Sequence, residues 1–494
     1  MTGFETLRMH VDGEWCEAAD GRMFATSNPY TGQEWASLPR AGAMDVDRAV
    51  KAAHHAFTQG DWPNWTASAR GAALVRLAGL IENEADRLAE IEVRDNGKLL
   101  AEMSNQCRYM ASWYAYYGGL ADKVEGSVPP IDKPGVVNMV TWEPLGVCAL
   151  ITPWNSPLLL LAWKLAPALA AGNTVVIKPS EHTSASTLAL IPLIVEAGIP
   201  PGVVNVVTGY GQEAGMPLVT HPLVRKVAFT GGEAAGRAIA EAAARGFKPV
   251  TLELGGKSPN IVFEDADIDA AVPGAVSGIF AASGQTCIAG SRLLLQEGIH
   301  DAFLDRLTEM ANAAVLGDPM DPGTNISPVA TKAQHEKILG YIDIAKAEGA
   351  SCILGGRAVH PAGSGGLFVE PTIFTGVTND MRIAREEVFG PVLCVMPFVD
   401  EDDAIRIAND SLYGLAAGVW TNDLSRALRM SRRLEAGTVW VNTYRSTSYT
   451  TPFGGTKHSG MGRENGMGAI REYMWQKSIW LAEPRQVENP FIRR

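Results

Sequence analysis

From residue 146 onward, short apolar runs rich in β-branched residues alternate with longer segments whose apolar positions recur at helical spacing. This alternation is typical of parallel strands joined by helical crossovers. It predicts the following elements: strand 147–152, helix 157–171, strand 174–178, helix 184–197, strand 203–207, strand 226–229, helix 233–245 and strand 250–254.

Prolines and glycines mark the ends of these elements. Pro157 suits the first position of a helix, and Gly172 suits a left-handed cap after the last. Pro192 lacks a backbone N–H group, so it should kink or shorten the helix over 184–197.

The flanking regions show related patterns. The first 125 residues look mainly helical, with amphipathic segments at 46–57 and 69–92 that should cover the sheet. After residue 287 a second alternating block predicts a second α/β domain, whose strands are expected at 292–296, 371–374, 392–397 and 438–442. Residues 360–366 read as a surface loop.

Composition narrows the class of protein. With 494 residues, 46% of them hydrophobic, the chain can bury a large core in more than one domain. Its formal net charge of −12 disfavours nucleic-acid and membrane partners, and no apolar stretch is long enough to span a bilayer. The six cysteines lack metal-site spacing, and residues 1–15 lack a signal sequence, so we expect reduced thiols, no metal and a cytoplasmic location.

Two residues suggest covalent catalysis. Cys287 is flanked by small residues in 284–290, and Glu253 lies in the strand and turn 252–259. A thiol open to substrate and a carboxylate that can move protons form a plausible nucleophile and base. A single cysteine is more often an inert core residue, so the pair gains weight only from other motifs.

Two motifs suggest a dinucleotide site. Residues 178–181 place Lys178 and Glu181 at the carboxyl end of a strand, where ligands bind in parallel sheets. A carboxylate there can accept ribose hydroxyl groups and would repel a 2′-phosphate, which favours NAD over NADP; a surface ion pair is the alternative. Residues 229–232 precede a helix whose free N–H groups could hold pyrophosphate. The glycine pattern of 209–215 matches a dinucleotide fingerprint only weakly and is equally a turn.

In these motifs the chain, from about residue 8 to 480, resembles the NAD(P)-dependent aldehyde dehydrogenase superfamily. The matching segments are 153–155, 178–181, 229–231, 252–257, 284–287, 386–391 and 452–455. The resemblance implies an α/β fold with a Rossmann-like parallel-sheet cofactor domain, a second α/β catalytic domain and a small β oligomerisation element. The corresponding divisions are 1–125 with 148–255, 256–458, and 126–147 with 474–494. A hairpin at 126–147 and an exchanged strand at 477–488 imply a homodimer or homotetramer.

The resemblance also implies a reaction, the NAD-dependent oxidation of an aldehyde to a carboxylic acid. Cys287 would attack the aldehyde to give a thiohemiacetal and then a thioester, while Asn155 and the Cys287 N–H stabilise the oxyanion. Glu253 would activate the water that hydrolyses the thioester, with Lys164 and Glu464 on its proton path.

Cofactor and substrate contacts follow by the same resemblance. Those expected for NAD are Ile151, Trp154, Lys178, Ser180, Glu181, Thr230, Gly231, Gly232, Leu254, Gln334, Lys337, Glu387 and Phe389. Gly232 replaces a serine that many relatives carry, so backbone donors must hold the pyrophosphate. Those expected for the substrate are Ser156, Leu160, Trp163, Thr286, Ile288, Arg445 and Thr447.

The expected substrate lining is unusually polar. Arg445 in particular suggests an aldehyde that bears a polar or carboxylate group, although an arginine paired with a surface acid is the alternative. Two other functions compete: a CoA-acylating semialdehyde dehydrogenase, and a protein that keeps the fold without catalysis. The presence of Glu253 favours hydrolysis by water, and the presence of Cys287 and Asn155 disfavours the non-enzymatic role.

Overall fold

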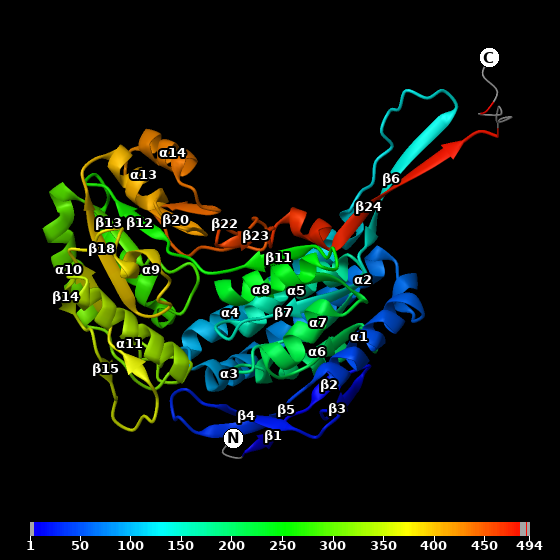
Figure 1. Cartoon of the computed structure of the whole chain (residues 1–494), viewed down its shortest axis with the longest axis horizontal. Coiled ribbons are helices and arrows are strands. Elements are labelled where there is room, and N and C mark those ends of the chain that lie inside the picture. The colour runs from blue at the N-terminus through cyan, green and yellow to red at the C-terminus, as the bar shows by residue number, and fades with distance from the viewer. Residues whose placement is uncertain (1–3, 485–490, 492–494) are drawn as a thin grey trace.

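The computed structural model describes residues 4–484 and 491 (Figure 1). Its first elements are five short strands, which the sequence pattern does not predict because each offers too few positions to establish a period. Three of them form a small sheet, and two join the edge of a larger one. These strands are β1 (Glu5–Thr6), β2 (Met9–Val11), β3 (Glu14–Cys16), β4 (Met23–Ser27) and β5 (Glu34–Pro39).

The larger sheet has eight strands in the order β23-β11-β10-β7-β8-β9-β2-β3. Its five central strands are parallel, as expected for strands joined by helical crossovers. They are β7 (Val147–Ile151), β8 (Thr174–Lys178), β9 (Val204–Val206), β10 (Val224–Thr230) and β11 (Val250–Glu253), with β23 (Gly460–Met461) antiparallel at one edge.

Helices cover both faces of this sheet, because successive residues of a strand point to opposite sides. In β7, Val147 and Ala149 pack in one core and Cys148 and Leu150 in the other. The first core contains α1 (Ala43–Thr58), α7 (Met216–Thr220) and α8 (Glu233–Ala244). The second contains α2 (Ala67–Asn83), α3 (Ala85–Asn96), α4 (Leu100–Leu120), α5 (Pro157–Ala170) and α6 (Ala185–Glu196).

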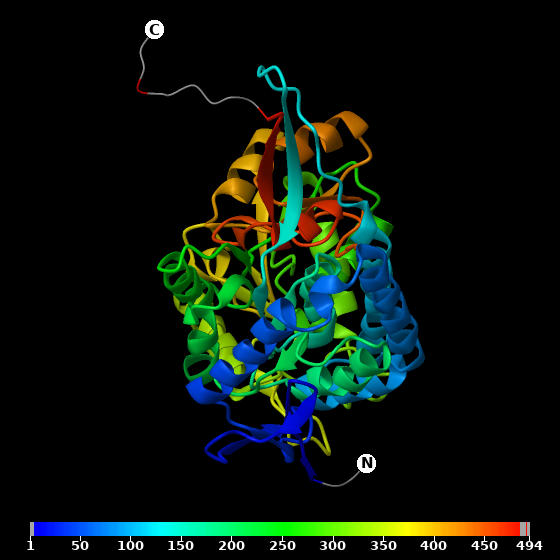
Figure 2. The same cartoon turned by 90° about the vertical axis from the view of Figure 1, so that its right-hand side faces the viewer.

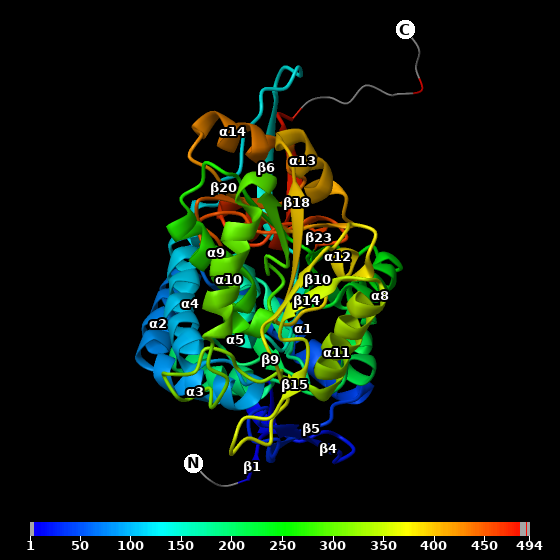
Figure 3. The same ribbon diagram turned by 90° about the vertical axis from the view of Figure 1, so that its left-hand side faces the viewer.

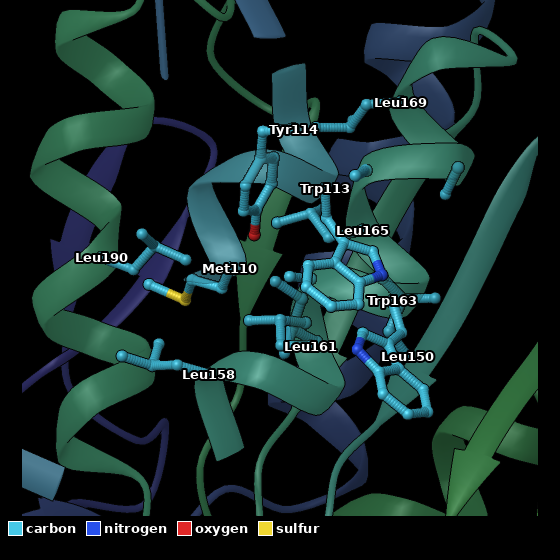
Figure 4. Packing of buried hydrophobic residues seen from close by; sticks show 14 of the residues in the cluster. Met110, Trp113, Tyr114, Leu150, Leu158, Leu161, Trp163, Leu165, Leu169 and Leu190 are labelled. Carbon is cyan, nitrogen blue, oxygen red and sulfur yellow. The ribbon is translucent and has the colours of Figure 1, made fainter. Parts of the chain in front are cut away.

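The buried side chains between α4 and α5 hold Trp163, which lines a cavity described below. Trp113 and Trp163 stack with ring centroids 6.0 Å apart, and Met110 and Leu161 pack beside them (Figure 4). Stacked, buried indoles have few alternative positions, so this packing fixes where Trp163 lies.

Some local predictions need correction. Gly172 does adopt the left-handed conformation, with φ of +96°. Pro192, however, does not end α6, which continues through it from Ala185 to Glu196. The predicted helix over 69–92 is two helices, α2 and α3, which meet at Glu84.

A second sheet of seven strands lies beside the first, in the order β14-β17-β18-β13-β12-β20-β21. All neighbours are parallel except β14 and β17. The strands are β12 (Pro259–Val262), β13 (Arg292–Gln296), β14 (Ser351–Leu354), β17 (Thr372–Thr375), β18 (Val392–Phe398), β20 (Ala416–Trp420) and β21 (Thr438–Val441).

Helices again cover both faces of this sheet, and Figure 3 shows α10 and α11 on either side of β18. One core contains α9 (Ile268–Phe280) and α10 (His300–Asn312). The other contains α11 (Lys332–Ala347), α12 (Arg382–Arg385), α13 (Glu401–Asn409) and α14 (Leu424–Arg433). Two small two-stranded sheets lie outside the large sheets. One pairs β15 (Ala358–Val359) with β16 (Phe368–Val369) around the loop 360–366, and the other pairs β19 (Tyr413–Gly414) with β22 (Thr456–Lys457).

A two-stranded ribbon projects from the body of the molecule (Figures 1 and 2). It pairs β6 (Val136–Pro144) antiparallel with β24 (Met474–Ala482). Of the strand expected at 477–488, residues 485–488 lie outside the described residues. None of the helices in residues 4–484 combines the length and apolar sequence needed to cross a membrane.

The segments that connect the two sheets position Glu253 and Cys287. Strand β11 ends at Glu253, and β12 of the second sheet begins at Pro259. Cys287 lies just before β13, in the loop that enters the second sheet. The carboxyl end of a strand in one sheet therefore approaches the amino end of a strand in the other.

Candidate active site

The loop that carries Cys287 is firmly held. The Ser283 hydroxyl lies 2.9 Å from the Ser327 carbonyl oxygen, and the Gln285 side chain bonds the backbone of Pro328 and Ala330 at 3.2 and 2.9 Å. Ser283 also adopts a left-handed conformation, with φ of +51°. Such backbone strain persists only where the surroundings over-determine it, so the sulfur is fixed in place.

Asn155 lies directly against this loop. It precedes α5, and its Nδ2 donates to the Gln285 carbonyl oxygen at 3.0 Å. That bond uses one of the two amide protons and orients the other. A second donor is therefore available next to Cys287.

Two cavities meet at Cys287. One has a volume of about 340 Å³ and the other about 140 Å³. Both are lined by Cys287, Asn155 and Leu160. The sulfur can therefore be reached from two sides, which is the arrangement that the sequence motifs lead us to expect for a substrate channel and a cofactor cleft.

The larger cavity, hereafter the substrate pocket, brings together all the residues expected for substrate. They are Ser156, Leu160, Trp163, Thr286, Ile288, Arg445 and Thr447. The pocket has further lining residues that the sequence motifs do not assign to the substrate. They come from before and along α4, from α5 and from the loop before β22: Lys98, Asn105, Gln106, Tyr109, Leu159 and Phe453. The spacing of positions 105, 106 and 109 places them on one helical face, which is a signal that a search for polar stripes could have used.

The smaller cavity, hereafter the cofactor cleft, takes many of the residues expected for NAD. They are Trp154, Thr230, Gly231, Gly232, Leu254, Gln334, Lys337, Glu387 and Phe389. The rest do not line it, because they lie at the carboxyl ends of β7 and β8: Ile151, Lys178, Ser180 and Glu181. There the Lys178 Nζ lies 3.5 Å from Glu181 Oε2 and donates to the Pro179 carbonyl at 2.7 Å.

The cleft residues fit a dinucleotide. No atom lies within 4 Å of where a Cβ on Gly232 would be, so the start of α8 is open to a ligand, and the first N–H groups of a helix lack intrahelical partners. Half-buried Glu387 accepts the Gly256 N–H at 2.9 Å, which fixes its carboxylate at the cleft.

Gln334 lines the cleft and also holds the backbone of its neighbours there. Its Nε2 donates to the carbonyl oxygens of Val388 and Phe389 at 2.8 and 3.0 Å. Phe389 adopts φ of +60°, a conformation that costs energy for a residue with a side chain. Gln334 therefore positions Phe389 at the cleft with its amide nitrogen.

Glu253 lies behind the two cavities and lines neither. Only 3% of its surface is exposed, and neither carboxylate oxygen has a hydrogen-bond partner among the described residues. Next to it, buried Lys164 forms an ion pair with Glu464 and donates to Thr230 Oγ1 at 2.6 Å. The three residues expected on the proton path thus form one buried group.

The surroundings shift the pKa values of both key residues. Burial raises the pKa of Glu253 well above its ordinary value, and Glu464 adds to the rise while Lys164 opposes it. Removal from water, with Glu387 and Glu253, raises the pKa of the Cys287 thiol to about 12. The thiol is therefore protonated at neutral pH and must lose its proton as it attacks.

Across residues 4–484, no group of three or more His, Cys, Asp or Glu side chains could hold a metal ion.

Comparison with known proteins gives consistent results. A sequence model of the aldehyde dehydrogenase family matches residues 15–479. The chain is 46% identical to (Z)-2-((N-methylformamido)methylene)-5-hydroxybutyrolactone dehydrogenase from Acinetobacter baylyi, over 99% of this chain and 100% of that protein. It is 45% identical to human retinal dehydrogenase 2, over 97% and 92%.

Solved structures agree. Betaine aldehyde dehydrogenase from Staphylococcus aureus in complex with NAD+ superposes with a TM-score of 0.97 at 40% identity, over 98% of this chain and 96% of that one. NAD-dependent aldehyde dehydrogenase from Sinorhizobium meliloti gives 0.96 at 40% identity, over 99% and 97%.

Proposed function

The chain belongs to the aldehyde dehydrogenase family, and from this premise we propose that it oxidises an aldehyde to a carboxylic acid through a thioester on Cys287, with NAD as the cofactor. One observation carries the proposal. Two cavities reach Cys287 and Asn155 from different sides, so an aldehyde and a dinucleotide can both approach the sulfur.

In the first step the Cys287 thiol gives its proton to solvent water and its sulfur attacks the aldehyde carbon, which places negative charge on the aldehyde oxygen. The free amide proton of Asn155 and the backbone N–H of Cys287 stabilise that charge. Preorganised donors of this kind contribute about 3–4 kcal/mol each to the transition state. Because the loop is held by Ser283 and Gln285, they need no rearrangement.

The cofactor supplies a hydride acceptor when it is bound. Trp154, Glu387 and Phe389 would hold its nicotinamide half in the cofactor cleft. The Gly231 N–H already donates to the Glu253 carbonyl oxygen at 3.0 Å, so the N–H groups at Gly232 and in the first turn of α8 would receive the pyrophosphate. The residues at the end of β8 would receive the adenosine ribose: Lys178, Ser180 and Glu181. The Glu181 carboxylate favours NAD there because it would repel a 2′-phosphate.

The second step is hydrolysis of the thioester. Within the described part of the chain no hydrogen bond holds either Glu253 oxygen, so the side chain can turn toward Cys287 and accept a proton from water. Lys164 and Glu464 lie next to it and pass that proton onward. The rate of hydrolysis should therefore depend on the protonation state of Glu253.

Changing the neighbours of Glu253 should move this pH dependence in opposite directions. Glu253 acts as a base when deprotonated, so hydrolysis accelerates as pH rises through its raised pKa. Glu464 raises that pKa, so Glu464→Gln should shift the rising limb to lower pH, and Lys164→Met should shift it to higher pH. Single-turnover thioester hydrolysis measured against pH tests this, and a limb that both variants leave unmoved would contradict the role of Glu253.

The substrate pocket favours a polar or carboxylate-bearing aldehyde. Arg445 lines it, and the Acinetobacter relative is named for dehydrogenating a 5-hydroxybutyrolactone. A lactone of that type is the ring-closed form of an aldehyde that carries a carboxyl group. Both observations support an acidic aldehyde as the substrate.

A panel of aldehydes tests the proposed function. Wild type should form NADH and a free acid without CoA, and the rate with a carboxylated aldehyde should exceed that with a neutral one of equal length. A requirement for CoA would instead identify an acylating enzyme. Absence of turnover across a broad panel would contradict aldehyde oxidation and favour a non-enzymatic role.

We further infer the division of the chain and its assembly. Residues 1–125 and 148–255 form the cofactor domain, and residues 256–458 form the catalytic domain.

The projecting ribbon exposes Trp475, Trp480 and Leu481 by 44%, 54% and 51%. Such apolar exposure on a two-stranded ribbon indicates that a second copy of the chain covers it, giving a homodimer or homotetramer.

A further inference from the structure

A lysine that the sequence motifs do not single out opens into the substrate pocket. Lys98 follows Gly97, which ends α3 in the left-handed conformation with φ of +75°, and precedes α4. Only 2% of Lys98 is exposed, and its Nζ donates to Ser156 Oγ at 3.1 Å. One of three ammonium protons is thereby used, and Lys98 lines the pocket together with Ser156.

The positive charges at this pocket exceed the negative ones. Neither Lys98 nor Arg445 lies within 4.0 Å of a carboxylate in the part of the chain that the structure describes. Arg445 uses Nη1 to bond the carbonyl oxygens of Ser277 and Ala281 at 3.4 and 3.1 Å, which leaves its other nitrogens for a ligand. Glu102 and Glu92 are the acids that act on Lys98. One oxygen of each is occupied, by the Ala282 N–H at 2.7 Å and by the Leu158 N–H at 2.8 Å.

A buried cation without a paired anion is costly, and a bound anion removes that cost. We propose that Lys98 and Arg445 together bind the carboxylate of an acidic aldehyde, and that the small side chain of Ser156 leaves the Lys98 ammonium open to it. This inference rests on the proposed function and adds a specificity-determining residue to it.

The position of Lys98 also limits the length of the substrate. Its partner Ser156 directly follows Asn155, the residue that faces the aldehyde oxygen. The anion site is therefore close to the reacting carbon, and the carboxylate and aldehyde must be joined by a short chain. Tyr109, Trp163 and Phe453 offer an aromatic wall for that chain.

Preference for an anion should depend on pH. Burial lowers the pKa of Lys98 to about 8; Arg445 lowers it as well, while Glu102, Glu92 and Cys287 raise it. The Lys98 charge is present below that pKa and lost above it. The ratio of kcat/KM for an acidic aldehyde to that for a neutral one should therefore fall as pH rises past about 8, and taking this ratio cancels groups that act on both substrates.

The test compares 4-oxobutanoate with butanal, which has the same number of carbons and no charge. Lys98→Met keeps the length of the side chain and removes its charge, and Ser156→Phe covers the ammonium. Lys51→Met, on the exposed surface of α1, is the matched control. Each purified protein is assayed from pH 6.5 to 9.5, and binding of butanedioate to Cys287→Ala with and without Lys98→Met is measured by calorimetry.

Lys98→Met should lower kcat/KM for 4-oxobutanoate by about 10- to 100-fold, mainly through KM, and lower that for butanal much less. Its substrate ratio should no longer change with pH, and Ser156→Phe should reduce the ratio in the same direction. Equal losses with both substrates would show that Lys98 only holds Ser156 in place and would overturn the inference. If wild type oxidises neither aldehyde, the proposed function fails, and butanedioate binding that Lys98→Met leaves unchanged would then overturn the inference as well.

Discussion

Replacing Cys287 by alanine should abolish aldehyde oxidation, lowering kcat by roughly 10⁴-fold or more. Without the sulfur no thiohemiacetal or thioester forms, and neither Asn155 nor Glu253 can supply the missing bond. Binding of NAD should persist, because the cleft residues Glu387 and Phe389 and the start of α8 are unchanged. NADH formation in the steady state and NAD binding by fluorescence quenching measure the two effects separately.

A second cysteine provides the control. Cys352 is half-buried like Cys287, but it lies on the edge strand β14 and lines neither cavity. Cys352→Ala should retain wild-type turnover. Substantial oxidation by Cys287→Ala, or a comparable loss in Cys352→Ala, would show that the nucleophile has been misassigned.

Replacing Glu253 by glutamine should stall the enzyme after the first turnover. Glutamine preserves the size of the side chain but cannot accept a proton, so the thioester forms and is not hydrolysed. We expect a burst of about one NADH per active site, followed by steady-state turnover reduced by roughly 10²- to 10⁴-fold. Rapid-mixing absorbance at the NADH wavelength measures both phases.

The alternatives to this result are informative. If Glu253→Gln also lost the burst, Glu253 would be needed before the thioester, and the order of steps would be wrong. If steady-state turnover were unchanged, another group would activate water. Glu196→Gln, at the exposed end of α6, provides a glutamate control for which no change is expected.

Elements with continuous buried sequences were the easiest to predict. Strands β8 and β13 have the predicted bounds, because each is a short apolar run between turn signals. The strands before residue 40 were missed, since β4 alternates over only five residues and the others are shorter or irregular. The course of α6 through Pro192 depends on packing against α2 and α3, which local propensity does not contain.

The residues of the candidate site likewise fall into those that sequence motifs identified and those that only the fold brings together. Ser156, Arg445 and the other expected substrate residues line one cavity, and motifs of contiguous sequence were enough to collect them. Contiguous motifs could not identify Lys98, because it precedes Ser156 by 58 residues and only the folded chain brings the two side chains together. The surroundings of Glu253 come from α5 and from the segment near residue 464, so its raised pKa is a property of the folded chain.

Mass spectrometry of the trapped intermediate can detect the thioester on Cys287 itself. Glu253→Gln is incubated with NAD and an aldehyde, quenched in acid and digested. The account predicts that the peptide containing Cys287 gains the mass of the acyl group, in proportion to the NADH formed and only when NAD is present. An acyl group on any other cysteine, or NADH formation without an adduct, would contradict it.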